Sequence, residues 1–289
     1  MSPFTETKRT NDVARWTASA TASVLLWISR TLLGLLVIFP ILQAIKASGM
    51  VSGPDGDSVL FRPGSLLLLE MFRVGANALG DGLRTALLLS ALAAVAQLLP
   101  LAVSLDLLWF EGSPLSARFR AAFRLFPRFL GLGAIALLAQ AALVLLASLL
   151  SAALKAPLQG HDERIGTLAP LALLALGLVG CGWVGCVLDI ARAALVRAEY
   201  SWREALILAL TRLRQEPLAV LAGGYPVAAA SSFAYLCCVW LMARLDLAHP
   251  SPRNLVLSFA AHQAAVLFAV AWRVRWLRRA LELSADSNR

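Results

Sequence analysis

Two aspartates are the residues of this chain whose type and position point most directly to chemistry. Asp106 and Asp189 each lie within about one helical turn of the end of a long apolar run. A carboxylate inside a membrane is costly, so it usually faces protein or water and often marks a proton or ion site. The structural interpretation is a latch: a carboxylate at a helix end reaches the headgroup layer or pairs with an arginine of the next helix. Arg192 also follows Asp189 by three residues. The latch is favoured, and the proton or ion site stays open as the alternative.

A second set of polar side chains lies deeper in the apolar runs. These are Gln97, Gln140, His262 and Gln263. They either line a path for a solute or form hydrogen bonds between helices. Each such hydrogen bond contributes about 0.6 kcal/mol to stability. His262 is of a type that titrates in the physiological range, but no carboxylate or second histidine stands at a helical spacing from it. Packing is therefore the favoured interpretation.

Signatures of an enzyme are absent from the sequence. It contains no HExxH, GxSxG or Walker motif, and only three histidines. All four cysteines fall inside apolar runs, and no CxxC pair lies in a loop, so neither a zinc site nor a disulfide framework is indicated. We expect no catalytic residue, no metal and no cofactor.

The elements that must position these residues are long and apolar. Of the 289 residues, 59% are hydrophobic. Six runs are long enough to cross a hydrocarbon layer of about 30 Å as helices, which satisfy their own backbone hydrogen bonds. We predict an all-α, polytopic membrane helical bundle forming one integral membrane domain over residues 1–289. The predicted spans are 25–45, 85–110, 129–154, 168–190, 217–242 and 255–272.

Arginine is concentrated in alternate gaps between the runs. Four segments carry a net charge of +2 or +3 each, and the other gaps are nearly neutral. This distribution follows the positive-inside rule, so we expect both termini in the cytoplasm of a bacterium and the chain in its inner membrane. The basic gaps would face anionic lipid headgroups, and the attraction between each cationic side chain and the membrane surface is worth about 1 kcal/mol. Nucleic acid is not an expected partner, although the whole chain carries +9. The basic segments are 1–30, 110–128, 191–216 and 273–289.

Two of the basic gaps resemble copies of each other. In each, a span ends near an aspartate, a capped amphipathic helix follows, and a proline opens the next span. Ser113 precedes Pro114, which suits the first helical position. Ser201 and Glu204 form a capping box. The pattern predicts interfacial helices over 114–126 and 202–216, and hairpin repeats.

A third interfacial helix is expected over 65–79. It lies in the longest gap between spans on the outer side and mixes apolar residues with Glu70 and Arg73. We expect a partner to bind the cytoplasmic interfacial helices, because these helices have cap residues at their ends and carry arginines and a tryptophan. The candidate interface residues are Arg120, Arg124, Arg212, Arg214 and Trp202.

One stretch carries a family resemblance. It reads Leu-Asp-Ile-Ala-Arg over 188–192, then Ser-Trp-Arg-Glu-Ala-Leu over 201–206 and Arg-Gln-Glu-Pro over 214–217, with a smaller contribution from 61–70. The chain resembles bacterial six-span integral membrane proteins similar to the membrane domain sometimes joined to glycerophosphodiester phosphodiesterases. The resemblance implies the six-span architecture. It implies no activity, because the phosphodiesterase domain is not in this sequence.

The sequence therefore predicts a multi-pass inner-membrane protein without a catalytic site. Its expected function is structural or accessory, organising a membrane-protein partner or a second copy of itself. The alternative is a transporter or channel for a small solute or ion, using Asp106 and Asp189. That alternative requires both aspartates, Gln97 and Gln140 to line one cavity.

Overall fold

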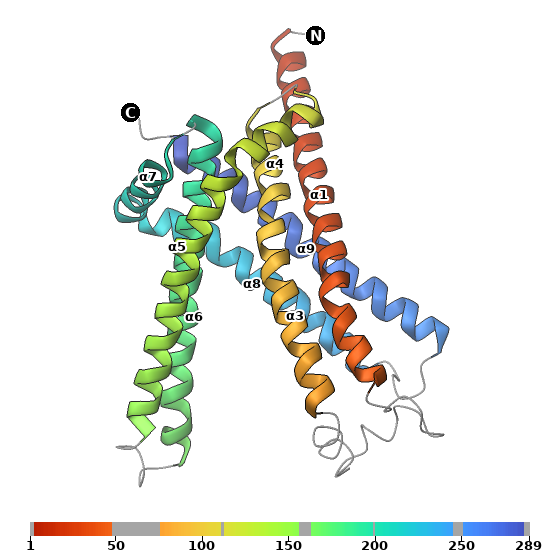
Figure 1. Cartoon of the computed structure of the whole chain (residues 1–289). Coiled ribbons are helices and arrows are strands. Elements are labelled where there is room, and N and C mark those ends of the chain that lie inside the picture. The colour runs from red at the N-terminus through yellow and green to blue at the C-terminus, as the bar shows by residue number, and fades with distance from the viewer. Residues whose placement is uncertain are drawn as a thin grey trace. The chain divides into compact units, whose positions relative to one another are not determined.

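A computed structural model describes residues 3–47, 76–110, 113–155, 163–198, 200–244 and 251–285 (Figure 1). Within those ranges every regular element is a helix, as the apolar periodicity predicted. The helices are α1 (Pro3–Ala47), α3 (Ala76–Ala96), α4 (Leu98–Trp109), α5 (Leu115–Lys155), α6 (Glu163–Ala198), α7 (Trp202–Gln215), α8 (Pro217–Arg244) and α9 (Pro252–Ala285).

The predicted fold class is confirmed. Six stretches are long and apolar enough to cross a membrane, and each overlaps one of the six predicted spans. Several are longer than predicted, because the helices continue past the apolar runs into the charged segments. The chain is therefore a membrane-embedded, multi-pass protein. The stretches are Arg15–Gln43, Gly80–Trp109, Leu115–Leu154, Leu168–Ala198, Pro217–Met242 and Pro252–Ala285.

The chain forms two compact units. Unit 1 comprises Met1–Ala22, Ala102–Ala230 and Trp272–Arg289, and unit 2 comprises Ser23–Leu101 and Ser231–Ala271. The unit boundaries fall inside helices, so α1, α4, α8 and α9 contribute to both units. Most of the candidate functional residues belong to unit 1.

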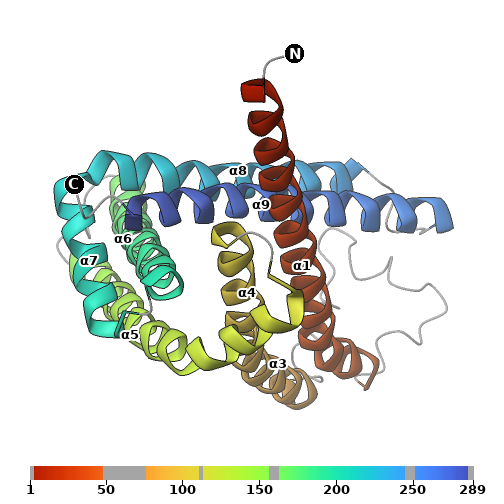
Figure 2. The ribbon, with the colours of Figure 1, turned by 90° about the horizontal axis from the view of Figure 1, so that it is seen from above.

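Unit 1 is built on the antiparallel pair α5 and α6, with α7 lying across one end (Figures 1 and 2). The small residues of span four allow close packing, as predicted. A Cβ atom added to Gly177 would lie 2.7 Å from Cβ of Ala147 on α5. The beginning of α5, α7 and the last turns of α9 gather at the same end of unit 1, opposite the last turns of α5 and the first turns of α6. We call this the basic end, because it carries the described arginines of 118–128, 192–214 and 273–279.

The expectation of a separate interfacial helix over 114–126 is wrong. This segment is the first part of α5, which runs without interruption from Leu115 through Pro127 to Lys155. Proline removes one backbone hydrogen bond and bends a helix without always ending it. Figure 2 shows the beginning of α5 turned away from the remainder of the helix, and Pro127 gives a physical reason for a bend in this helix. The segment is still amphipathic, but it is anchored to a span.

A separate helix is present over the second predicted segment, 202–216. Helix α7 runs from Trp202 to Gln215 and ends at Glu216, whose φ of −131° and ψ of 58° are not helical. A residue before proline is biased away from the helical region, and Pro217 follows. The same sequence pattern thus produces a bend at Pro127 and a break at Pro217. The outer helix predicted over 65–79 lies outside the described residues, except that 76–79 begin α3.

The capping box of α7 is present as predicted. The Ser201 hydroxyl accepts a hydrogen bond from the Glu204 backbone N–H at 3.3 Å. The Ser201 N–H donates to Glu204 Oε2 at 2.8 Å. These two bonds satisfy N–H groups that the start of a helix otherwise leaves unpaired.

Replacing Ser201 with alanine should loosen the first turn of α7. Loss of an N-cap of this kind costs about 1 kcal/mol, so amide exchange in that turn should become about fivefold faster. Hydrogen–deuterium exchange with mass spectrometry measures this rate. Thr211→Ala is the control, because the Thr211 hydroxyl bonds only to the Ile207 carbonyl within α7. Equal exchange in both variants would contradict a capping role for Ser201.

Acid should weaken the same cap. The hydrogen bonds from the backbone and hydroxyl of Ser201 hold the pKa of Glu204 below its ordinary value of 4.5. A carboxyl with a lowered pKa in the folded state contributes stability above its unfolded pKa, and that stability is lost as pH falls through the folded value. Exchange at the start of α7, corrected for its intrinsic pH dependence, should therefore rise below pH 4.5. Glu204→Gln should abolish this acid step.

Candidate functional site

Asp189 lies at the centre of the most strongly bonded polar cluster in unit 1. Its side chain is only 1% exposed. Its Oδ1 accepts a hydrogen bond from Arg273 Nη2 at 2.5 Å, and its Oδ2 accepts one from Trp276 Nε1 at 2.7 Å. Arg192 Nη1 lies 3.6 Å from the same Oδ1. Both carboxylate oxygens are therefore engaged, by donors from two helices.

Sequence reasoning identified only part of this cluster. The spacing of three residues between Asp189 and Arg192 predicted their pairing, and the structure has it. Arg273 and Trp276 were missed. They stand three residues apart near the end of α9, so they share one helix face. That spacing was the available signal, although it does not say which acid the pair would meet.

Helix α8 closes over the cluster because two of its residues have no side chain. A Cβ atom on Gly223 would lie 2.4 Å from Cζ3 of Trp276, and one on Gly224 would lie 2.1 Å from Sγ of Cys186. Either distance is shorter than atoms tolerate, so α8 reaches this position only with glycine there. A cavity of about 240 Å³ remains beside Asp189, Arg273 and Trp276.

The chemistry available to this cluster is that of a latch. Arginine and indole donors bind the two carboxylate oxygens and hold the carboxylate in one orientation between α6 and α9. Two guanidinium groups and one carboxylate leave the cluster with a net positive charge. The cluster joins α6 to the last turns of α9 within unit 1.

A second aspartate–arginine pair joins α4 to α5. Arg118, which is 4% exposed, donates from Nη1 to Asp106 Oδ2 at 3.2 Å and to the Asp106 carbonyl at 2.8 Å. Its other nitrogens donate to the carbonyls of Phe110 at 2.8 Å and Ser113 at 2.9 Å. One guanidinium thus bonds three backbone carbonyls at and just after the end of α4, and the Asp106 carbonyl also accepts the Phe110 N–H at 2.9 Å. The prediction that an aspartate would pair with an arginine of the next helix holds for Asp106.

Arg197 makes a third attachment at the basic end. Its guanidinium donates to the Ser284 carbonyl on α9. It also lies over the ring of Trp109, with 5.6 Å between the guanidinium carbon and the ring centroid. We call Arg118, Arg192, Arg197 and Arg273 the inner arginines, because each binds a group of unit 1. They come from three different basic segments of the sequence.

The deeper polar residues make local contacts between helices. Gln140 Nε2 donates to the Cys181 carbonyl at 3.1 Å, joining α5 and α6 in unit 1. In unit 2, Gln97 Oε1 accepts from the Ser29 hydroxyl at 3.4 Å. Gln263 Oε1 accepts from Trp27 at 3.1 Å and from Thr31 at 3.3 Å. The His262 ring lies 6.4 Å from that of Tyr235. Each of these contacts joins one helix to another, as the packing interpretation predicts.

The predicted residues thus fall into separate groups. The structure brings Asp189 and Arg192 together and places Asp106, Gln140, Gln97 and His262 in four other contacts. Within the described part of the chain, histidine, cysteine, aspartate and glutamate form no group of three or more that could hold a metal ion.

The predicted interface residues divide between surface and interior. Arg120, Arg124, Arg214 and Trp202 are exposed, and the Trp202 ring packs against the Arg203 guanidinium at 5.1 Å. Arg212 differs from expectation, because it is buried with Ala205 and Ala209 on the inner face of α7. It lies seven residues after Ala205, on the same helix face. Its Nη1 contacts Glu216 Oε1 at 3.5 Å.

Comparison with known proteins yields no relative. No protein-family model, curated protein or solved structure matches this chain. The function must be inferred from the site itself.

Removal of the Asp189 carboxylate should destabilise unit 1 strongly. Asp189→Ala leaves Arg192 and Arg273 beside each other without a counter-charge, and breaking a buried pair in this way costs about 3–5 kcal/mol. Thermal unfolding of the detergent-solubilised protein measures the loss. A second replacement, Arg273→Met in the same chain, should restore part of it, because one uncompensated charge is removed.

The matched control is the exposed pair Asp81–Arg84, whose atoms lie 3.5 Å apart. Exposed pairs contribute about 0–1 kcal/mol, so Asp81→Ala should change the melting temperature little. An Asp189→Ala protein as stable as the Asp81→Ala protein would show that Asp189 is no latch.

Proposed function

We propose that this chain is a non-enzymatic, multi-pass protein of the bacterial inner membrane that organises a membrane-protein partner at its cytoplasmic surface. The basic end of unit 1 would lie in the cytoplasm, in accord with the positive-inside rule. The observation that carries the proposal is the division of the arginines. The inner arginines stabilise unit 1, while others at the same end are exposed beside exposed apolar side chains.

The first part of α5 is the best candidate contact surface. Phe123 is 62% exposed and stands between Arg120 and Arg124, which are also exposed. Aromatic residues and arginine are enriched at protein interfaces, where a ring fills a pocket and guanidinium groups meet carboxylates. Figure 2 shows the beginning of α5 turned away from the rest of that helix.

Transport, the alternative function, receives less support from the geometry. It requires Asp106 and Asp189 to share a pathway with Gln97 and Gln140. Each aspartate is instead held by arginine donors of its own, and Gln140 is bonded to a backbone carbonyl. The cavity beside Asp189 would admit a small solute only if the bonds from Arg273 or Trp276 were released.

Photo-crosslinking in intact cells tests the proposed contact. A photoreactive phenylalanine analogue in place of Phe123 should form a discrete crosslink to a protein. Leu138 is the matched control position, because it is 72% exposed on the same helix but lies within the apolar run 129–154, which leaves out Phe123. The analogue at position 138 should label lipid and give no such product. Peptides in the crosslinked product distinguish another protein from a second copy of this chain.

Charge changes supply the second half of the test. Arg120→Glu with Arg124→Glu should abolish the crosslink at position 123. Because reversed charge also affects topology, Arg120→Gln with Arg124→Gln is made in parallel, and accessibility of an introduced cysteine verifies the orientation. A crosslink unchanged in both double variants, or lipid adducts alone at position 123, would refute the proposal.

A further inference from the structure

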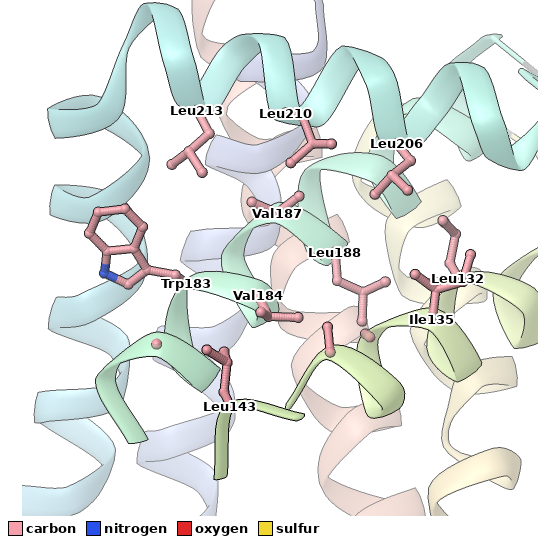
Figure 3. Close-up of a pocket in the computed structure, with 13 residues that line it drawn as sticks. Leu132, Ile135, Leu143, Trp183, Val184, Val187, Leu188, Leu206, Leu210 and Leu213 are labelled. Atoms are coloured by element: carbon pink, nitrogen blue, oxygen red, sulfur yellow. The ribbon is translucent and has the colours of Figure 1, made fainter. Parts of the chain in front are cut away.

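An apolar groove runs between α5, α6 and α7 in unit 1. Figure 3 shows leucines of α7 pointing toward α6 and α5, with the groove between them. Its volume is about 470 Å³, within the range of about 300–1,000 Å³ typical of ligand sites. Every side chain that lines it is apolar or is the indole of Trp183. Such a surface offers no group that would hold a polar solute.

The dimensions of the groove favour a single hydrocarbon chain. Its lining on α5 extends from Leu132 to Leu143, which corresponds to about 16 Å of helix at 1.5 Å per residue. That is about half of the roughly 30 Å hydrocarbon core, or one leaflet. The volume and this length describe a long, narrow apolar space, which the shape and chemistry of an extended hydrocarbon chain match.

The groove has a cationic rim at one end only. Arg128 stands one turn before Leu132 on α5, at the basic end, and its Nη1 donates to the Tyr200 carbonyl just before α7 at 3.2 Å. Arg203, also exposed, precedes the groove residue Leu206 by three positions. Among the described residues at this rim, Glu204 is the acid; its Oε2 is bonded to Ser201, and its carboxylate also interacts electrostatically with Arg128. With Arg128 and Arg203 against Glu204, these three residues carry a net positive charge.

We propose that the groove binds one acyl chain of an anionic phospholipid, with its phosphate beside Arg128. The apolar lining would hold the chain, and the guanidinium would form a charge-assisted hydrogen bond to the phosphate. Helix α7 would cover the chain where it enters the leaflet. The lipid would fill the space between α7 and the α5–α6 pair, and this binding requires no protein partner.

Trp183 provides a direct test, because it lines the groove and bromine on a lipid chain quenches indole fluorescence on contact. The full chain is reconstituted in phosphatidylcholine vesicles containing increasing amounts of acyl-brominated phosphatidylglycerol. The difference in emission between the natural chain and Trp183→Phe isolates this residue among the eight tryptophans. Quenching should saturate at a low fraction of the brominated anionic lipid. Brominated phosphatidylcholine should quench only in proportion to its fraction.

Two pairs of variants locate the lipid. Ala139→Phe places a ring in the groove and should abolish saturable quenching, whereas Leu138→Phe, on the lipid-exposed face of α5, should retain it. Arg128→Gln should raise the half-saturating lipid fraction about fivefold. Arg275→Gln removes the same charge from α9, away from the groove, and should leave it unchanged.

Three outcomes would overturn the inference. Equal quenching by the two brominated lipids would exclude a headgroup-selective site. Saturable quenching that persists in Ala139→Phe would place the lipid elsewhere. Absence of quenching by either lipid would mean that protein, such as a second copy, covers Trp183.

Discussion

The constraint on which unit 1 depends is the burial of one carboxylate. A charged group removed from water costs several kcal/mol unless donors replace its hydration. Asp189 meets this requirement through Arg273, Trp276 and Arg192. Because two of those donors come from α9, the end of α9 cannot leave α6 without exposing the carboxylate to an apolar environment. Gly223 and Gly224 then allow α8 to pack against the cluster.

The arginines at the basic end serve two physical purposes. The inner arginines carry charge into unit 1, where each meets a carboxylate or backbone carbonyls, as Arg118 does at the end of α4. The exposed arginines, such as Arg120 and Arg214, keep their charge at the surface. Positive charge that orients a membrane protein therefore also contributes to its packing, since a guanidinium has five donors and can satisfy several acceptors.

The two similar segments before Pro127 and Pro217 differ in how the chain passes the proline. At Pro127 one backbone hydrogen bond is missing, but the helix continues through the proline. The amphipathic segment therefore stays continuous with its span. At Pro217 the preceding Glu216 leaves the helical conformation, so α7 is free to lie across α5 and α6. The groove exists because of that break. A continuous helix would carry Leu206 and Leu210 away from α6.

What the sequence by itself determined is local. Six helices follow from the length of the apolar runs, the start of α7 from Ser201 and Glu204, and the Asp189–Arg192 pair from a spacing of three residues. Each depends on neighbours in the chain, where helical geometry alone brings the groups together. The prediction of a separate helix over 114–126 was wrong, because a proline either bends or ends a helix, depending on the packing around it.

Tertiary structure decided which distant groups meet. Asp189 lies 84 residues from Arg273 and 87 from Trp276, and no periodicity selects that pair among the arginines and tryptophans available. The inward position of Arg212 and the groove beneath α7 depend likewise on how α7 packs on α5 and α6. The length of the apolar runs is enough to predict the helices. Which helices pack together in a membrane depends on close packing and on hydrogen bonds to buried polar groups.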